Sequence, residues 1–456
     1  MMMLSEAAHV LGAGLDGTDA RFTSVSTDTR TLQPGALFIA LAGERFDGHR
    51  YVEAAAAAGA VAAVIERASR AVVGAAAIPL LAVEASRAAL ATLARHWRTR
   101  FAFPLIGVVG SNGKTTTKEM IAAILRAEWG AAEVFATTGN LNNEIGLPLS
   151  VLQLRPQHRA AVLELGMNHV GETAVLAGIA APTIGLINNA QREHQEFMAS
   201  VEAVAAEHAA LIDALPAGGV AVLNADDGHY GFWRRRAGAR QVASFGLAGG
   251  ADVTARFTSV PGGTEMDIRL PHGAARAVLR IPGEHNVRNA LAAAAAAAAA
   301  GASAKSIGEG LSAFQPAKGR LQLKSGIKGA TVIDDSYNAN PDSVRAAIDV
   351  LAGAPSPAIL VLGDMGEVGD QGPQFHREVG DYARARGIAR LLALGEATRD
   401  SVQAFGSGGE HFADVDALWR ALEGLLSPHT TVLVKGSRFM RMERVVDALV
   451  GAAAKG

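Results

Sequence analysis

The feature that most constrains the fold is a short apolar run followed at once by a loop rich in glycine and threonine. The run is Leu105-Ile-Gly-Val-Val109, and the loop reads Gly110-Ser-Asn-Gly-Lys-Thr-Thr-Thr117 before a helical pattern that begins at Lys114. Glycines let backbone N–H groups turn toward phosphates, and a helix N-terminus adds partial positive charge. The pattern predicts a phosphate-binding loop between a buried strand and a helix.

The side chains of this loop indicate nucleotide chemistry. Lys114 would neutralise the β- and γ-phosphates, and the Thr115 hydroxyl would bind Mg²⁺. The general pattern has a glycine where this chain has Val108, so the loop is a shortened variant. A chance turn is the alternative, which the strand–loop–helix setting disfavours. The predicted nucleotide-binding residues here are Gly110, Ser111, Asn112, Gly113, Lys114, Thr115 and Thr116.

Composition sets the class of protein. The chain has 456 residues, of which 49% are hydrophobic and 19% charged, as expected for a globular protein of about three domains. Its 42 basic and 44 acidic residues give no support to nucleic-acid binding. The absence of cysteine excludes disulfides, thiol nucleophiles and cysteine-bound metals. No signal peptide or apolar run of membrane-spanning length is evident, so we expect a cytoplasmic protein without a membrane span.

Strand-like and helical patterns alternate along most of the chain, which predicts an α/β fold with mostly parallel sheets. We place a smaller N-terminal α/β domain at residues 1–103. A central P-loop domain with a parallel sheet follows at 104–316, and a Rossmann-like C-terminal domain at 317–456. Residues 250–283 alternate instead and turn near Pro261 and Pro271, which predicts antiparallel hairpins.

The loop at 110–117 resembles the ATP loop of the Mur ligase superfamily, and further similar motifs extend over nearly the whole chain. They are, in order, Thr138-Gly-Asn-Leu-Asn-Asn-Glu-Ile-Gly-Leu-Pro148, Glu164-Leu-Gly-Met-Asn168, Gly283-Glu-His-Asn-Val-Arg-Asn289, Lys318-Gly-Arg320, Asp334-Asp-Ser-Tyr-Asn-Ala-Asn-Pro341, Gly363-Asp-Met365 and Lys435-Gly-Ser-Arg438. Within the superfamily, the stretches at 140–143 and 335–341 resemble the enzymes that add D-alanyl-D-alanine. The Asp-Asn-Pro-Arg signature of the diaminopimelate-adding relatives does not occur in this sequence.

The resemblance implies an ATP- and Mg²⁺-dependent amide ligase that adds D-alanyl-D-alanine to UDP-N-acetylmuramoyl-tripeptide. The reaction would pass through an acyl phosphate and form ADP and phosphate, in peptidoglycan synthesis and hence cell-wall biogenesis, cell shape and cell division. We expect a monomer. Two alternatives remain: another ligase of the superfamily with a different amino acid or a folate, and a nucleotide-dependent switch. The third residue of the acceptor peptide, diaminopimelate or lysine, is open.

The resemblance also implies the residues that act on ATP. Lys114, Glu164, His194 and Arg320 would be catalytic, and Thr115, Glu164 and His194 would hold the metal. Glu164 ends one predicted strand and His194 follows another, at the sheet edge where ligands bind. Asn286, Asn289, Arg320 and Asp335 would contact the nucleotide, although Asn286 could instead be a helix N-cap.

Residues for the other substrates follow from the same resemblance. Ser26, Thr27, Asp28 and Arg30 would hold the uridine diphosphate, and the neighbouring Asp47-Gly-His49 supports a UDP-binding domain that folylpolyglutamate synthetases lack. The muramoyl-peptide would contact Asn140, Asn142 and Asn143. Lys435, Ser437 and Arg438 would lie near the peptide or the incoming dipeptide.

One departure from the family concerns the metal site. Many Mur ligases carry a carbamylated lysine on the helix that follows the His194 region, but this chain has no lysine between Lys118 and Lys305. Ungapped placement puts His208 at that position, with Glu207 beside it. We hypothesise that Glu207 or His208 takes over the metal-side role; the alternative is that this helix is only structural.

Overall fold

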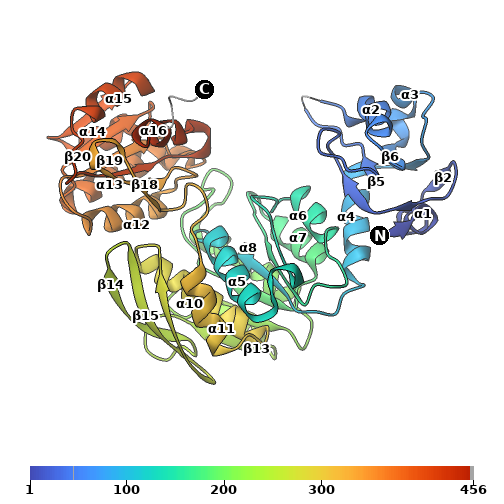
Figure 1. Cartoon of the computed structure of the whole chain (residues 1–456), viewed down its shortest axis with the longest axis horizontal. Coiled ribbons are helices and arrows are strands. Elements are labelled where there is room, and N and C mark those ends of the chain that lie inside the picture. Colours follow the sequence, from blue (N-terminus) through green and yellow to red (C-terminus); the bar gives the residue numbers. More distant parts are fainter. Residues whose placement is uncertain (45, 452–456) are drawn as a thin grey trace.

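The computed structural model describes residues 1–44 and 46–451. It shows three α/β bodies in chain order, with the first and last on opposite sides of the middle one (Figure 1). Each body contains its own largely parallel sheet, so the predicted α/β fold is confirmed. Within the described residues, no helix combines the length and the apolar character that a membrane span requires.

The N-terminal body has a five-stranded sheet in the order β2-β7-β6-β5-β4, in which only β2 is antiparallel to its neighbour. A small antiparallel pair, β1–β3, lies beside it. The elements are β1 (Met2–Met3), α1 (Leu4–Leu11), β2 (Gly14–Asp16), β3 (Arg21–Phe22), β4 (Ser24–Ser26), β5 (Ala36–Ile39), α2 (Val52–Ala57), β6 (Ala62–Glu66), α3 (Arg70–Val73), β7 (Leu80–Val83) and α4 (Ser86–Arg98).

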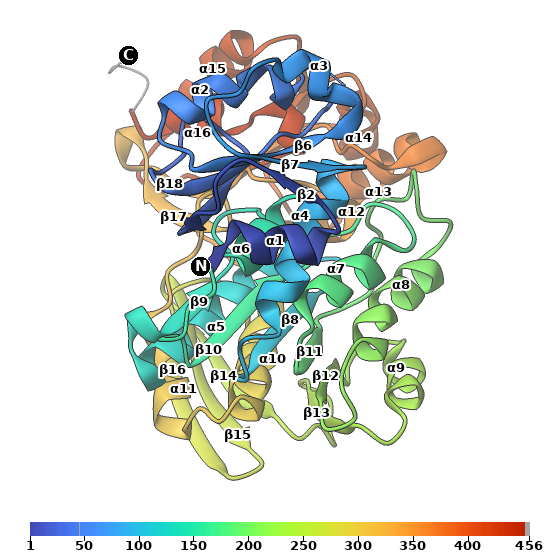
Figure 2. The ribbon, with the colours of Figure 1, turned by 90° about the vertical axis from the view of Figure 1, so that its right-hand side faces the viewer.

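Helix α4 fastens this body to the central one. Its apolar residues recur at helical spacing, so that Leu90, Leu93 and Trp97 are buried on one face. That face contacts α6 and α7 of the central body, and the indole N–H of Trp97 donates to the Leu154 carbonyl at 3.0 Å. In the view of Figure 2, α4 runs from the N-terminal sheet down to the central helices.

The central body is a six-stranded parallel sheet in the order β13-β12-β11-β8-β10-β9. Chain order reverses at β8, and ligands of open α/β sheets bind at the carboxyl ends of strands flanking such a point. The strands are β8 (Leu105–Val109), β9 (Val134–Ala136), β10 (Ala160–Glu164), β11 (Ile184–Ile187), β12 (Val220–Asn224) and β13 (Gln241–Phe245), and the helices are α5 (Lys114–Trp129), α6 (Gly146–Val151), α7 (Glu172–Ala180), α8 (Val201–Asp213), α9 (Tyr230–Ala237), α10 (Glu284–Ala299) and α11 (Ala304–Ala313).

Helices cover both faces of this sheet, which explains why its inner strands are continuous apolar runs. Ile106 and Val108 of β8 belong to the core under α5 and α10, whereas Leu105 and Val109 belong to the core under α6, α7 and α8. The alternation fixes the face of the sheet that each side chain enters. Gly110 lies at the carboxyl edge of the sheet because it directly follows Val109, the last residue of β8.

Residues 254–279 form the predicted antiparallel sheet, of β14 (Thr254–Val260), β15 (Gly263–Leu270) and β16 (Gly273–Leu279). Met266, Ile268 and Leu270 alternate with exposed residues along β15 and are buried. This apolar face contacts α10, and β16 contacts α11. The prediction of hairpins is confirmed.

Helices α5 and α11 approach closely because Gly310 has no side chain. A Cβ at Gly310 would lie 2.4 Å from the Cα of Ile124. We expect Gly310→Ala to lower the free energy of unfolding by about 1–3 kcal/mol, measured by urea denaturation. Gly178→Ala on α7 is the control: a Cβ there meets nothing nearer than Arg95 at 3.8 Å, so it should be neutral or slightly stabilising. Equal losses in both variants would contradict this packing.

The C-terminal body has the sheet order β17-β18-β22-β19-β20-β21, parallel except for β17. A capping box between Asn340 and Ser343 begins α12, and the Asn340 side chain donates to Asn112 Oδ1 of the central body at 2.9 Å. The elements are β17 (Gln322–Ser325), β18 (Thr331–Asp335), α12 (Pro341–Ala352), β19 (Ala358–Gly363), α13 (Gly372–Ala385), β20 (Arg390–Leu394), α14 (Thr398–Phe405), β21 (Gly409–Phe412), α15 (Val415–Glu423), β22 (Thr431–Lys435) and α16 (Glu443–Leu449).

Candidate active site

Two adjoining cavities lie between the central and C-terminal bodies. The larger has a volume of about 780 Å³ and the smaller about 320 Å³. Both are lined by Asn112 and Gly113 of the glycine-rich loop and by Arg320 and Lys435 from the other body. The predicted nucleotide loop therefore lies where the two cavities meet.

The segment after β11 holds the loop in place. Backbone N–H groups of Ser111 and Asn112 donate to Asn189 at 3.1 and 2.8 Å, and the Asn188 side chain donates to the Asn112 carbonyl at 2.8 Å. Gly113 has a φ of 78°, and a Cβ there would lie 2.4 Å from the Asn289 side chain. The loop is thus fixed before any ligand arrives, and position 113 admits only glycine.

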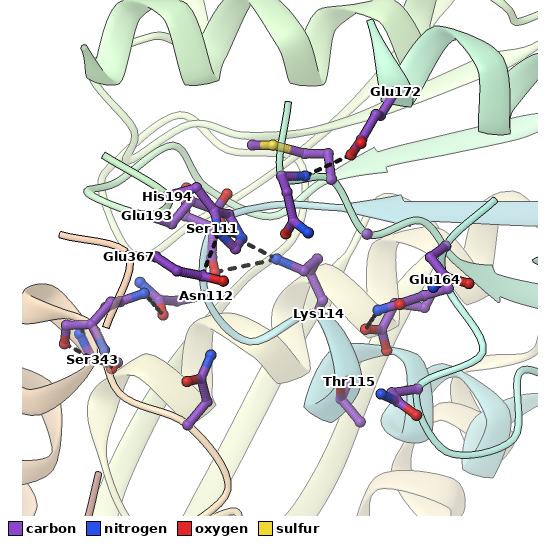
Figure 3. Close-up of a pocket in the computed structure, with 18 of the residues that line it drawn as sticks. Ser111, Asn112, Lys114, Thr115, Glu164, Glu172, Glu193, His194, Ser343 and Glu367 are labelled. Atoms are coloured by element: carbon purple, nitrogen blue, oxygen red, sulfur yellow. Dashed lines mark hydrogen bonds and ion pairs between the residues drawn. The ribbon is translucent and has the colours of Figure 1, made fainter. Parts of the chain in front are cut away.

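Lys114 is the first residue of α5 and points back over the loop. Its ammonium donates to the carbonyls of Gly110 at 2.5 Å and Ser111 at 3.3 Å, and lies 3.2 Å from Glu193 Oε2. Thr115 lines the larger cavity and Thr116 the smaller one. Figure 3 shows Lys114 with the Glu193–His194 group on one side and Glu164 on the other.

Glu164 ends β10 and is 2% exposed. Its Oε1 accepts from the Asn142 side chain at 2.8 Å, while Oε2 has no hydrogen-bond partner among the described residues. A buried carboxylate oxygen is costly to leave unpaired, so a cation in the cavity would stabilise it. Asn142, predicted to bind substrate, therefore also orients Glu164.

His194 and Glu193 reach the same cavity from the loop after β11. His194 has a φ of 49°, unusual for a residue with a side chain, and its Nδ1 lies 2.7 Å from Glu367 Oε2 of the C-terminal body. Burial raises the pKa of Glu193, but the charges of Lys114, His208 and His194 outweigh burial and lower that pKa to about 2. No sequence motif predicts Glu193 as a site residue.

The smaller cavity is lined by the start of α10. Asn289 donates to Asn286 Oδ1 at 3.0 Å and accepts from Asn188 at 2.8 Å, which ties α10 to the loop segment. Helix α10 begins at Glu284 with Gly283 as its N-cap, so the N-cap interpretation of Asn286 is wrong. His285, which was also missed, lines this cavity; burial, Lys435 and Arg288 lower its pKa to about 4, so its imidazole is neutral near pH 7.

Charged residues of the C-terminal body close both cavities. Lys435 Nζ lies 2.5 Å from Asp335 Oδ2, and both side chains are buried. Burial lowers the pKa of Lys435 and raises that of Asp335, and their mutual attraction opposes both shifts. The guanidinium of Arg320 stacks 4.1 Å over the ring of Tyr337, which holds it flat at the junction of the cavities.

Comparison with known proteins agrees with this geometry. Three family models match, described as "Mur ligase family, catalytic domain" at 21–98, "Mur ligase middle domain" at 108–297 and "Mur ligase, glutamate ligase domain" at 319–438. The chain belongs to the Mur ligase family. Arg320, Asp335 and Lys435 of this Mur ligase lie within the third match and Lys114, Glu164 and His194 within the second.

Individual relatives match over nearly their whole length. A UDP-N-acetylmuramoyl-tripeptide–D-alanyl-D-alanine ligase from Escherichia coli is 40% identical, over 98% of both chains. The ligase of the same name from Haemophilus influenzae is 36% identical over 97% of both. Among solved structures, MurF from Acinetobacter baumannii superposes with a TM-score of 0.90 at 32% identity over 98% of both chains. MurF from Thermotoga maritima in complex with ADP gives 0.82 at 26% identity, over 93% of this chain and 96% of that one.

Only some of the residues predicted for the muramoyl-peptide and the dipeptide line the larger cavity. Asn140, Asn142, Asn143 and Lys435 line the larger cavity of this Mur ligase, whereas Ser437 and Arg438 do not. Asn143 Oδ1 also accepts from the Gly146 N–H at 2.8 Å and so supports the start of α6. Ser437 accepts from the Gly366 N–H, and Arg438 pairs with Glu443 on the surface.

The four residues predicted for the uridine diphosphate lie outside both cavities: Ser26 ends β4, and Thr27, Asp28 and Arg30 follow it in the next turn. Hydrogen bonds from Arg30 lower the pKa of the Asp28 carboxyl to about 2. Nearby His49 is buried, with Nδ1 2.6 Å from Asp47 and Nε2 accepting from the Glu66 N–H. His49 is therefore a structural residue of this body.

The helix proposed to replace the carbamylated lysine is α8. Its Glu207 accepts from the backbone N–H groups of Gly171 and Thr173 at 2.8 and 2.7 Å. That carboxylate stabilises the start of α7 and does not line the metal-side cavity, so the Glu207 alternative is wrong. His208 is 1% exposed, and its Nε2 lies 3.3 Å from Glu193 Oε1.

Arg192 joins the central body to the C-terminal body. Its guanidinium lies 2.5 Å from Asp342 and 2.7 Å from Glu378, and these carboxylates raise its pKa. We expect Arg192→Ala to loosen the two bodies, widen the distribution of particle sizes in small-angle scattering, and lower kcat/KM about 10- to 100-fold through misalignment. Arg236→Ala is the control, because Arg236 pairs only within the central body, with Asp213 at 2.8 Å. Unchanged kcat/KM in Arg192→Ala would contradict the assignment.

Proposed function

We propose that this Mur ligase uses ATP to join D-alanyl-D-alanine to UDP-N-acetylmuramoyl-tripeptide, releasing ADP and phosphate. The names of the full-length relatives support the substrates. One observation of the site carries the chemistry: the lysine of a phosphate loop and a buried carboxylate with an unpaired oxygen, Glu164, line one cavity that the C-terminal body closes.

ATP would span both cavities. Residues 110–116 bind the phosphates through backbone N–H groups and Lys114, while Asn286, Asn289 and Asp335 contact the nucleoside in the smaller cavity. The ADP complex of the Thermotoga maritima relative supports a nucleotide in this fold. Arg320, at the junction, stabilises the phosphoryl group during transfer because its planar guanidinium matches phosphate oxygens.

The donor set also fits Mg²⁺. Thr115, Glu164 and His194 line the larger cavity, and Glu164 Oε2 is a buried oxygen without a partner in the described part of the chain. We assign these three residues to the metal. When held by these residues, Mg²⁺ would neutralise negative charge that develops during phosphoryl transfer.

The chain's own groups perform positioning and charge stabilisation. The tripeptide carboxylate and the γ-phosphate are both anionic, so they approach only where cations offset their repulsion; Lys114 and Arg320 supply that charge. Phosphoryl transfer turns the carboxylate into an acyl phosphate with a good leaving group. The amine of D-alanyl-D-alanine then attacks the carbonyl carbon, phosphate leaves, and closure of the two bodies excludes water.

The remaining substrates would be held at the periphery. We assign Ser26, Thr27, Asp28 and Arg30 of the N-terminal body to the uridine diphosphate, and Asn140, Asn142 and Asn143 to the muramoyl-peptide. Lys435, Ser437 and Arg438 are assigned to the peptide end and the dipeptide. We propose domain boundaries at 1–103, 104–316 and 317–456, and a monomeric enzyme that works in the cytoplasm, where ATP is supplied.

Omitting one substrate at a time tests this function. With ATP, Mg²⁺ and UDP-N-acetylmuramoyl-tripeptide present, phosphate release should require D-alanyl-D-alanine for turnover. Release that is indifferent to both peptides would refute the ligase and favour a nucleotide switch. Release that depends on the UDP-peptide but responds to a different amino acid would keep the family and change the acceptor.

A further inference from the structure

A buried carboxylate that the roles above leave unused lies beside the phosphate loop. Glu193 is 5% exposed and lines the larger cavity. Its Oε2 is 3.2 Å from Lys114 Nζ, and its Oε1 is 3.3 Å from the buried Nε2 of His208. Neither Oε1 nor either nitrogen of His208 has a hydrogen-bond partner of good geometry among the described residues. Glu193 and His208 are therefore buried side by side, but their polar atoms are not all hydrogen-bonded.

The side chains nearest to Glu193 are groups that can carry a positive charge. Lys114, His208 and His194, at 3.8 Å, are its nearest ionisable partners, and a charge removed from water needs such partners. In the proposed reaction Lys114 turns toward the phosphates, which removes the strongest of these contacts. Glu193 then requires another cation at the place that the ammonium leaves, which lies between Glu193 and Glu164 in the view of Figure 3.

We propose that Glu193, oriented by His208, is a second carboxylate arm of the Mg²⁺ site. This inference rests on the proposed function. The described residues contain no group of three or more acidic or histidine side chains already arranged around a metal. Mg²⁺ does not need one, because it is commonly held by one or two carboxylates together with phosphates and water. Glu164 and Glu193 supply two such carboxylates, each with an oxygen that makes no hydrogen bond of good geometry in the described part of the chain.

This assignment explains how the chain dispenses with the carbamylated lysine of its family. A carbamate places one negative charge at the end of a helix side chain. Here His208 stands at that helix position, but its side chain is shorter than a carbamylated lysine and its imidazole does not supply a negative charge. Glu193, from the facing loop, brings the negative charge, and His208 fixes the carboxylate as a positioning residue. The metal site is then built without carbon dioxide.

The test is Mn²⁺ binding to the full-length protein with ADP, followed by electron paramagnetic resonance of the free ion. We expect Glu193→Gln, which keeps the shape and removes the charge, to weaken Mn²⁺ binding about tenfold or more. Glu193→Asp should retain part of the affinity, and His208→Gln should lose about tenfold. Glu196→Gln is the matched control, because Glu196 is exposed on the same loop and does not line the cavity.

Wild-type affinity for Mn²⁺ in Glu193→Gln would overturn the proposal, even if turnover fell, because Glu193 would then act only on Lys114. The turnover of the wild-type protein should not change when carbon dioxide and bicarbonate are removed. A fall in that turnover would also overturn the proposal. Thermal melts identify any variant that fails to fold. The carbon dioxide test uses the wild-type protein, so its result does not depend on the folding of a variant. Mn²⁺ binding with ADP requires neither peptide, so a failure of the ligase function would be seen separately.

Discussion

Lys114→Ala is expected to reduce kcat about 10³-fold, the scale on which a cation aimed at a transferring phosphoryl group contributes to the rate. The ammonium of Lys114 is held over the loop by the carbonyls of Gly110 and Ser111, so no large rearrangement is needed to reach a phosphate. Single-turnover ADP formation measures the effect directly. Binding of the UDP-peptide should change much less than kcat, because the residues assigned to the uridine diphosphate lie on another body.

Lys305→Ala is the matched control for this prediction. Lys305 is exposed on α11, and its ammonium lies 3.8 Å from Glu309 of the same helix. Lys305 lines neither of the two cavities, so its loss removes the same charge away from the site. Near wild-type turnover in Lys114→Ala, with its fold confirmed by circular dichroism, would contradict the assignment of the loop as the ATP site.

Glu164→Gln should lower kcat about 100-fold or more and raise the Mg²⁺ concentration needed for half-maximal rate. The substitution keeps the shape of the side chain but replaces the unpaired anionic oxygen with a neutral group, and a metal that loses a charged ligand stabilises the transition state less. Steady-state rates over a Mg²⁺ titration separate the two effects. Asn142→Ala should also raise the Mg²⁺ concentration needed for half-maximal rate, but by less than Glu164→Gln does, because Asn142 only orients Glu164.

A carboxylate outside the site provides the comparison for Glu164. Glu133 lies on the surface just before β9, 3.7 Å from Arg159. Glu133→Gln removes one negative charge, as Glu164→Gln does, and should leave the Mg²⁺ titration unchanged. If Glu164→Gln gave that same unchanged titration, Glu164 would not belong to the metal site.

Much of the fold could be predicted because its signals are local. The apolar run of β8, the glycine loop and the start of α5 are adjacent in sequence, and the alternation along β15 needs only its own side chains. Elements such as α14 and β21 were missed because they are short and only partly buried, so their patterns are weak. Strand β9 is likewise brief and follows a loop without a distinct turn signal.

The site could be predicted where single residues follow strands, as Glu164 and His194 do. It could not be predicted where function depends on contacts between distant segments. Glu193 has no motif of its own, and only folding brings it to Lys114 and His208. Asn142 and Glu164, 22 residues apart, likewise meet only in three dimensions. Glu207 had the right chemistry and neighbourhood in sequence, but its helix turns that carboxylate toward α7.

The mass of the reaction product tests the central claim most directly. The protein would be incubated with ATP, Mg²⁺, UDP-N-acetylmuramoyl-tripeptide and D-alanyl-D-alanine, and the UDP-sugar pool analysed by mass spectrometry. We predict a species heavier than the starting UDP-peptide by one D-alanyl-D-alanine less water, formed in step with ADP. ADP formation with the UDP-peptide mass unchanged would contradict the assignment of this Mur ligase as the enzyme that adds the dipeptide.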